Sequence, residues 1–327
     1  MGLSLRAERS IIPDFDMHYR LLSNQKIQRK FYRAIRETVR PGDVVLDIGT
    51  GSGIHAIFAC KAGARKVYAV EETAVIQLAK KIARDNGYSE KIHFICGRSQ
   101  EIKLPEKADV AVTYVGFSKT LRNLQDARNR FLKKEGILIP SSVEFLFAPV
   151  TSGKVYKQTV DFWSRKKYGI NWRSFRPFTA NRPKNARFRR ADFLSKPQRF
   201  PRIDFKTALS PRVGWKTRFR AGKTALLHGL ACWPSFQLSK NVTLSSDTQQ
   251  GSQKDPLPHI FLPLERPIKI RRGQNLRVEI AIYFDVKNLV DSVWEWSVEY
   301  NGQRFKQSSF KSLPLSKEIL TKLANGS

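Results

Sequence analysis

The 327-residue sequence is poor in cysteine and in acidic residues, and it has no long apolar run. Its three cysteines, Cys60, Cys96 and Cys232, are too few and too scattered for a disulfide framework or a zinc site. We therefore expect a reduced, cytoplasmic protein without a bound metal. No segment approaches the roughly 18 apolar residues of a membrane-spanning helix, and the N-terminus lacks the apolar core of a secretory signal.

The shortage of acidic residues leaves a large positive charge. Lys and Arg number 59 against 28 Asp and Glu, which gives a formal net charge of +31. A charge of this size favours anionic partners such as nucleic acid, acidic protein or anionic lipid, and it carries no information about the fold. The 41% of hydrophobic residues is ordinary for a globular chain and argues against general disorder.

The first 150 residues alternate between strand-like and helix-like patterns. Apolar runs predict strands at 44–48, 66–70, 91–97, 108–115 and 136–150, and helical spacing predicts helices at 25–40, 53–63, 74–87 and 120–136. Strands separated by helices of this length indicate βαβ units and a parallel sheet, which is an α/β fold. From about residue 224 the pattern becomes strand-like, as at 275–286 and 292–302.

A basic segment lies between these two parts. Residues 154–223 contain 21 Lys and Arg against three acidic residues, interleaved with aromatic side chains. Proteins that bind single-stranded nucleic acid use cationic side chains to contact the phosphates and aromatic rings to stack on the bases. An acidic peptide substrate would match the charge equally well. Alternatively, the aromatic side chains pack a core and the charges form a solvated surface.

A glycine-rich turn follows the first strand, in "VVLDIGTGSGIHAIFACKAGARKVYAVEET". A dinucleotide fingerprint would place its third glycine at Ile54, whereas here the glycines are Gly49, Gly51 and Gly53. Asp47 would repel a pyrophosphate and would attract a cationic amino group. Glu71 ends the second strand, where a carboxylate can accept both hydroxyl hydrogen bonds of a ribose. These residues predict an S-adenosylmethionine site, with a turn that holds no ligand as the alternative.

The same stretch resembles the class I methyltransferases, and closely the protein arginine methyltransferases. Residues 17–35, "KIHFICGRSQEIKLPEKADV" and 127–140 resemble further parts of that family, and the distal part is similar to its C-terminal β-barrel. The resemblance implies a Rossmann-like methyltransferase domain at 1–142 and a β-barrel substrate domain at 143–327 with the basic insertion at 154–223. It also implies three groups of cofactor-binding residues. The residues at the turn and the methionine moiety are Asp47, Gly49, Thr50, Gly51 and Gly53. Glu71 would bind the ribose, and Ser99 and Gln100 would contact the adenine.

The acceptor motifs of the family are not kept. Its two glutamates hold a guanidinium bidentately, but Tyr114 or Val115 stands at the first glutamate's place, and Lys119 and Arg122 follow. The family's Thr-His-Trp motif is also absent, and His259 falls at a neighbouring position. We take Tyr114 and His259 as the candidate catalytic residues, with a surface or loop histidine as the alternative for His259. Ile27 stands at the position of the family's cofactor-clamping Arg, and Arg29 or Arg20 could substitute for it.

Three functions remain open on these grounds. The first is methyl transfer from S-adenosylmethionine to a protein or peptide acceptor. The second is a methyltransferase acting on RNA or another polyanion, and the third is a cofactor-binding pseudoenzyme. Because the family dimerises through an arm, residues 154–223 could hold a remodelled arm and the chain could form a homodimer.

Overall fold

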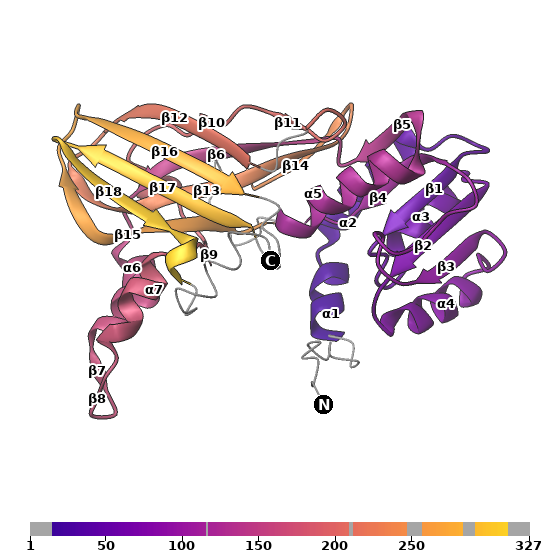
Figure 1. Cartoon of the computed structure of the whole chain (residues 1–327), viewed down its shortest axis with the longest axis horizontal. Coiled ribbons are helices and arrows are strands. Elements are labelled where there is room, and N and C mark those ends of the chain that lie inside the picture. Colours follow the sequence, from indigo (N-terminus) through magenta and orange to yellow (C-terminus); the bar gives the residue numbers. More distant parts are fainter. Residues whose placement is uncertain (1–14, 116, 209–211, 247–256, 284–291, 313–327) are drawn as a thin grey trace, which may run out of the picture. The chain divides into compact units, whose positions relative to one another are not determined.

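The computed structural model describes residues 15–115, 117–208, 212–246, 257–283 and 292–312, with the backbone alone at 117–120 and 122 (Figure 1). Internal contacts divide the chain into two compact units. The first comprises the residues up to Ser142 together with Asp204–Thr207 and Phe236–Leu244. The second comprises Val143–Ile203, Ala208–Ser235 and the residues from Ser245 onward.

The first unit is built on a five-stranded parallel sheet with strand order β3-β2-β1-β4-β5. Its strands are β1 (Val44–Ile48), β2 (Lys66–Glu71), β3 (Ile92–Cys96), β4 (Ala108–Thr113) and β5 (Leu132–Ile139). All five residues of the central strand β1 are buried, because helices cover the sheet. The sequence therefore predicted the Rossmann-like sheet correctly.

The helices of this unit are α1 (Phe15–Ser23), α2 (Gln25–Thr38), α3 (Ile54–Lys61), α4 (Val75–Asp85) and α5 (Phe117–Asp126). Helix α2 begins where the Asn24 side chain accepts a hydrogen bond from the Ile27 backbone amide at 3.3 Å, which is an N-cap. Its buried side chains include Ile27, Phe31 and Ala34, which follow helical spacing and form one apolar face. Helix α2 packs against α3.

Two element boundaries differ from the sequence-based expectation. The helix predicted at 120–136 ends at Asp126, passes through a π-helical turn at Ala127–Phe131, and gives way to β5. Pairing with β4 overrides the local helical pattern there, through a bulge that shifts the register between Ala108 and Val110. The single strand predicted at 136–150 is two strands, β5 and β6 (Ser142–Val150), in different sheets. Pro140 stands between them, and its missing N–H cannot continue a ladder.

The second unit contains two large antiparallel sheets. One has the order β10-β6-β13-β15-β9 with β11 and β14 attached, and the other has the order β12-β16-β17-β18. The long strands are β12 (Arg212–Arg220), β13 (Ala225–Ser239), β15 (His259–Ile270), β16 (Asn275–Tyr283), β17 (Val293–Tyr300) and β18 (Gln303–Ser308). The short ones are β9 (Lys184–Ala186), β10 (Gln198–Arg199), β11 (Ile203–Asp204) and β14 (Val242–Ser245). Together they form the expected β-barrel. The buried Trp296 indole joins the two sheets by donating to the Pro263 carbonyl at 2.8 Å.

The basic segment contributes to this barrel's core. Tyr156, Phe188 and Phe200 are buried, and Trp215 packs against Phe147 and Phe200. Between them the cations stay on the surface, as at the exposed Arg187 and Arg189 that flank the buried Phe188. Of the two interpretations of this segment, core packing therefore accounts for these aromatic side chains.

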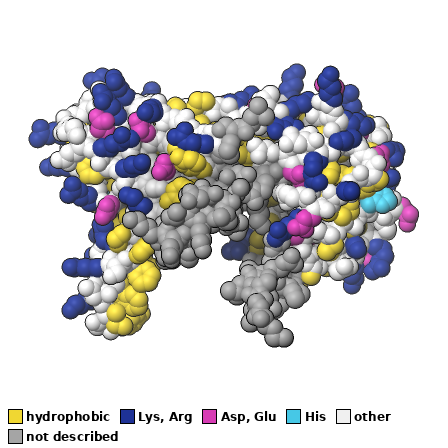
Figure 2. All heavy atoms as spheres, in the orientation of Figure 1, with side chains coloured by type: hydrophobic (Ala, Val, Ile, Leu, Met, Phe, Trp, Pro, Cys, Tyr) yellow, Lys and Arg dark blue, Asp and Glu magenta, His cyan; other side chains and the backbone are white. Residues whose placement is uncertain are grey.

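Part of the basic segment forms an arm. It comprises α6 (Gly153–Thr159), a hairpin of β7 (Lys166–Lys167) and β8 (Ile170–Asn171), and α7 (Arg176–Ala180), with the hairpin at the end far from the barrel sheets (Figure 1). Its base is fixed by Tyr156, whose hydroxyl lies 2.7 Å from the Glu265 carbonyl of β15. Figure 2 shows apolar side chains gathered on the arm.

Candidate functional site

The candidate site lies at the carboxyl end of the parallel sheet. Strand β1 pairs with β2 on one side and with β4 on the other, so the strand order reverses beside it. Ligands of open α/β sheets bind at such a switch point, outside the carboxyl ends of the strands. Asp47 lies near the end of β1, Glu71 ends β2, and Ser99 and Tyr114 follow β3 and β4.

The glycine turn requires its glycines. Gly49, Gly51 and Gly53 have φ angles of +72°, +53° and +83°, in the left-handed region that other residues rarely adopt. The amides of Gly49 and Thr50 donate to the Val70 carbonyl of β2 at 2.8 and 2.9 Å, which anchors the turn to the sheet. A Cβ on Gly49 would meet open space, so a ligand can approach the backbone there.

Asp47 is fully buried beneath this turn. Its Oδ2 accepts hydrogen bonds from the Thr50 hydroxyl at 2.5 Å and from the Ala56 amide at 3.0 Å, which joins the strand, the turn and the start of α3. Its Oδ1 is buried and has no hydrogen-bond partner among the described residues. Burial raises the pKa of this carboxyl to about 7, with a small further contribution from the charge of Glu71.

Glu71 is fixed by the protein on both of its oxygens. Its Oε2 accepts from the Gly51 amide at 3.1 Å. Its Oε1 accepts from the Thr73 amide at 3.0 Å and the Thr73 hydroxyl at 2.7 Å. Each carboxylate oxygen has further acceptor capacity, so a diol can bind to a carboxylate whose position is already fixed. The sequence did not indicate the role of Thr73.

The turn after β3 holds the other two predicted cofactor residues. The Ser99 hydroxyl is buried without a hydrogen-bond partner in the described part of the chain, while its carbonyl accepts from the Arg130 guanidinium. Gln100 is exposed. The predicted adenine-binding roles of both residues stay predictions.

The chemistry of these residues fits S-adenosylmethionine. A buried carboxylate with one free oxygen suits a cationic amino group, and a second carboxylate at the end of β2 suits a ribose. The unpartnered Asp47 Oδ1 and Ser99 Oγ are polar atoms that cost free energy when buried alone. A polar ligand that reaches them removes that cost.

Tyr114 lies in an aromatic cluster with Phe31 and His55. The Phe31 ring stacks on His55 with centroids 4.3 Å apart and on Tyr114 with centroids 5.7 Å apart. Burial raises the pKa of Tyr114 to about 12 and lowers that of His55 to about 4, so both side chains are neutral near pH 7. The buried His55 Nε2 has no hydrogen-bond partner among the described residues. His55 was not identified from the sequence, although it is the polar residue in the apolar stretch "GIHAIFA".

His259 belongs to the second unit, at the start of β15. It is buried against Phe188 and Trp233, and its Nδ1 accepts a hydrogen bond from the Phe188 amide at 3.1 Å. Burial, helped by the charge of Arg187, lowers its pKa to about 4. Its catalytic role stays a prediction, and its contacts are those of a neutral histidine in a core.

Comparisons with known proteins agree with this fold. The family model of the ribosomal protein L11 methyltransferase matches residues 31–143. Protein arginine N-methyltransferase 6 of Xenopus laevis is 28% identical over 288 residues, which cover 82% of this chain and 84% of that protein. A probable protein arginine N-methyltransferase 6.1 of Oryza sativa is 30% identical over 66% of this chain and 59% of its own length.

Solved structures show the same fold at low sequence identity. The enzyme–prozyme heterotetrameric complex of protein arginine methyltransferase 1 from Trypanosoma brucei with S-adenosylhomocysteine has a TM-score of 0.78 and 21% identity, over 89% of this chain and 96% of that one. Protein arginine methyltransferase 10 of Arabidopsis thaliana has a TM-score of 0.73 at 21% identity over the same shares.

These similarities support a class I methyltransferase of the protein arginine methyltransferase type. Two of the similar structures, the trypanosomal complex and protein arginine methyltransferase 6, hold S-adenosylhomocysteine, which is the product form of S-adenosylmethionine. The matched family model covers only the cofactor-binding part of this methyltransferase, and it therefore does not identify the acceptor. In the described residues no group of three or more His, Cys, Asp or Glu side chains is placed to hold a metal ion. None of the described helices has the length and apolar character needed to cross a membrane.

Replacing Glu71 with Ala should weaken the binding of S-adenosylhomocysteine by about 1.5 to 3 kcal/mol, because two charge-assisted hydrogen bonds to the ribose disappear. The Gly51 amide also loses its acceptor. Isothermal titration calorimetry measures the change. Glu72→Ala is the matched control, since the neighbouring Glu72 is exposed and pairs with Arg98. Unchanged affinity in Glu71→Ala, or tight binding of NAD to the wild-type protein, would contradict the assignment.

Replacing Asp47 with Asn should stabilise the ligand-free protein at high pH. A carboxyl whose folded-state pKa is raised contributes stability that is fully present below its ordinary pKa of 3.8 and is lost progressively as the pH rises to the folded-state value, here about 7. The thermal midpoint of Asp47→Asn should therefore exceed that of the wild type most at pH 8.5 and by a smaller margin at pH 5.5, as measured by differential scanning fluorimetry. Cofactor affinity should fall at both pH values. An equal loss of thermal stability at both pH values would show that burial of the charge is not the dominant effect.

Proposed function

We propose that this protein transfers the methyl group of S-adenosylmethionine to a protein or peptide acceptor. The observation that carries the proposal is the pair of fixed carboxylates, Asp47 and Glu71, on either side of the glycine turn. The cofactor supplies an electrophilic methyl group to an attacking nucleophile. The chain's own contribution is to hold and align the reactants, which such a displacement chiefly requires.

The acceptor side differs in charge from that of an arginine-binding pocket. The sequence has no acidic residue between Asp109 and Asp126. Both flanking carboxylates are engaged elsewhere, since Asp109 accepts from Lys133 at 2.7 Å and Asp126 accepts from Arg130 at 2.5 Å. The side chains of Lys119 and Arg122 lie outside the described residues. Tyr114, at the position of the family's first glutamate, presents a neutral phenol that can donate or accept a hydrogen bond.

The acceptor is accordingly neutral or lies in an acidic sequence context. A guanidinium that finds no carboxylate forfeits about 3 kcal/mol for each charge contact at ~5 Å and an effective dielectric constant of ~20. Two such missing contacts correspond to several powers of ten in specificity.

Gly-Arg-rich peptides should therefore not be methylated efficiently. The test is mass spectrometry of such peptides after incubation with the protein and S-adenosylmethionine, with a Gly-Arg-active arginine methyltransferase as the positive control for the assay. Efficient formation of mono- or dimethylarginine would show that another group supplies the missing carboxylates.

A polyanion is the second candidate acceptor. The support for it is the exposed cations of the basic segment, such as Arg187, Arg189 and Arg190 around the buried Phe188. Counterion release would make such binding strongly dependent on salt. The burial of Tyr156 and Phe200 removes these two rings from the surface where bases would stack, which weakens this candidate relative to a protein acceptor.

Labelled methyl transfer into an extract of the source organism distinguishes the candidate functions. We expect label in the protein fraction, and nuclease treatment of the extract should leave that signal unchanged. Asp47→Asn is the control, because its cofactor site is impaired. Loss of the label after nuclease treatment would favour the polyanion acceptor. The absence of transfer by a protein that binds the cofactor would favour a pseudoenzyme.

We further propose that the arm mediates a homodimer, as the heterotetrameric assembly of the trypanosomal relative suggests. Tyr168 and Ile170 at its hairpin are 94% and 54% exposed, which is unusual for side chains of this size. Trp163 stacks on Phe175 with centroids 4.8 Å apart and stiffens the arm behind them. A rigid arm with an apolar end is suited to a second copy of the chain.

The double substitution Tyr168→Ser and Ile170→Ser should convert the dimer to a monomer, because the apolar area at the end of the arm is lost. Sedimentation velocity measures the mass. Lys166→Ser, in the same hairpin, is the matched control and should leave the mass unchanged. A monomeric wild type, or a double variant that stays dimeric, would contradict the role of the arm.

The free thiols of Cys60, Cys96 and Cys232 support a location in the reducing cytoplasm. We therefore propose a cytoplasmic location for this protein.

A further inference from the structure

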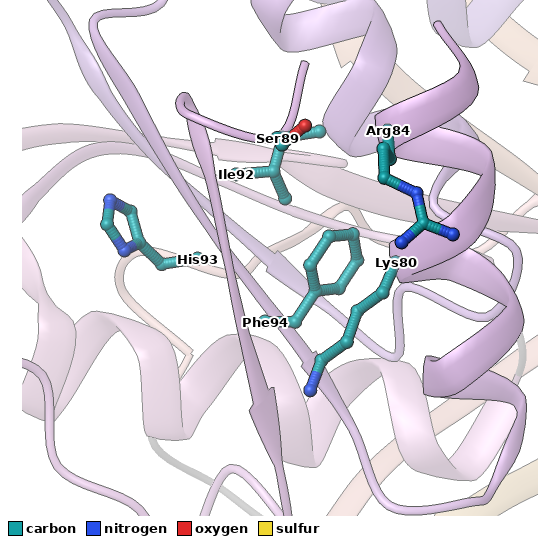
Figure 3. A pocket seen from close by; sticks show the side chains of 6 residues that line it. All are labelled: Lys80, Arg84, Ser89, Ile92, His93 and Phe94. Carbon is teal, nitrogen blue, oxygen red and sulfur yellow. The ribbon is translucent and has the colours of Figure 1, made fainter. Parts of the chain in front are cut away.

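A cavity in the first unit lies apart from the predicted cofactor residues. It is a cavity of about 380 Å³ between helix α4 and strand β3, lined by Lys80, Arg84, Ser89, Ile92, His93 and Phe94. Figure 3 shows Lys80 and Arg84 reaching from the helix and the Phe94 ring pointing toward them, while the His93 ring points away. None of the predicted cofactor residues lines this cavity.

The strand beside the cavity has an unpaired edge. Strand β3 is the terminal strand of its sheet in the described structure. The Val67 amide donates to the Lys91 carbonyl and the Gly97 amide donates to the Glu71 carbonyl, so the odd-numbered residues of β3 bond to β2. The Phe94 N–H and C=O therefore point outward. An exposed edge of this kind is a template for another strand.

The two cations beside this edge have no acidic partner among the described residues. Lys80 and Arg84 are four residues apart on α4, an arrangement that places like charges side by side and destabilises a helix by a few tenths of a kcal/mol. Other cations of the same unit pair with carboxylates, as Arg65 does with Glu106 and Arg98 with Glu72. Within the described part of the chain, neither Lys80 nor Arg84 forms such a pair. An anion bound at the cavity relieves their repulsion.

We propose that the β3 edge and α4 form a docking groove for an extended acidic peptide, which adds to the sheet as a further strand. Its backbone pairs with the outward N–H and C=O of Phe94, alternate acidic side chains meet Lys80 and Arg84, and apolar atoms cover Phe94 and Ile92. A nucleic acid strand would use the two cations but not the free backbone edge. The groove binds its peptide independently of methyl transfer, so its test does not depend on the acceptor.

The thiol of Cys96 lies on the same face of β3 as Phe94 and can report whether the groove is occupied. Cys96 is two residues beyond Phe94, so its side chain points to the same side, and it is exposed while Cys60 and Cys232 are buried. Docking of a peptide along β3 should shield the Cys96 thiol from alkylation.

The experiment uses a fluorescent ten-residue peptide of alternating Glu and Val, with its Lys–Val counterpart and a ten-nucleotide oligouridine as comparison probes. Fluorescence anisotropy measures binding to the full chain. Lys80→Glu with Arg84→Glu should weaken binding of the Glu–Val peptide at least about tenfold, which is one lost contact of about 1.4 kcal/mol. Arg36→Glu with Lys61→Glu is the matched control, because it makes the same change in net charge at exposed positions away from the cavity. It should change affinity less than about threefold.

The strand geometry is tested with the peptide itself. N-methylation of one alternate set of its amides removes the donors that face Phe94 and should abolish binding, whereas methylation of the other set should be tolerated. Saturating Glu–Val peptide should also slow alkylation of Cys96. Equal weakening by both charge-reversal pairs, tolerance of N-methylation at both sets of amides, or tighter binding of oligouridine with Cys96 still reactive would each overturn the proposal.

Discussion

The buried carboxylate of Asp47 is the constraint on which the cofactor site depends. One of its oxygens joins three elements, because it accepts from Thr50 in the turn and from Ala56 in α3 while its own backbone lies in β1. The other oxygen is left without a partner among the described residues. A buried carboxylate that is only half satisfied is unfavourable in a ligand-free protein, and its raised pKa expresses that cost. A cationic ligand group that pairs with the other Asp47 oxygen would therefore offset the free-energy cost of burying this carboxylate.

The parallel sheet converts this local arrangement into a binding site. In the parallel pairing of β1 with β2, Asp47 lies opposite Ala69, which is two residues before Glu71. The two carboxylates therefore lie near the ends of neighbouring strands, at the same edge of the sheet. The Gly51 amide then joins the turn to Glu71, which fixes the second carboxylate relative to the first. Because backbone hydrogen bonds to Val70 hold the same turn, its position follows from the sheet and does not require a bound ligand.

The sequence was sufficient to predict the parallel sheet and its glycine turn, because the signals for them are local. Glycines at positions of positive φ, an acid before them and an acid at the end of the next strand all lie within about 25 residues of each other in the chain. The cluster of Phe31, His55 and Tyr114 could not be predicted, since three separate elements bring it together. The strand at Leu132–Ile139 was missed because pairing with β4 decides it, against a helical pattern. The burial of Phe188 and Phe200 likewise depends on barrel strands remote in sequence.

The charge of the whole chain and the loss of acceptor carboxylates act in the same direction. A Gly-Arg-rich substrate is a polycation, and a protein of net charge +31 repels it before any contact with the site forms. The same field raises the local concentration of acidic segments, which screening limits to about 8 Å at physiological salt. Long-range attraction alone does not select one acidic chain from another, so selection requires a surface with directional contacts. The proposed groove would supply those contacts, because backbone pairing along β3 fixes the register in which alternate side chains meet Lys80 and Arg84, which have no acidic partner among the described residues.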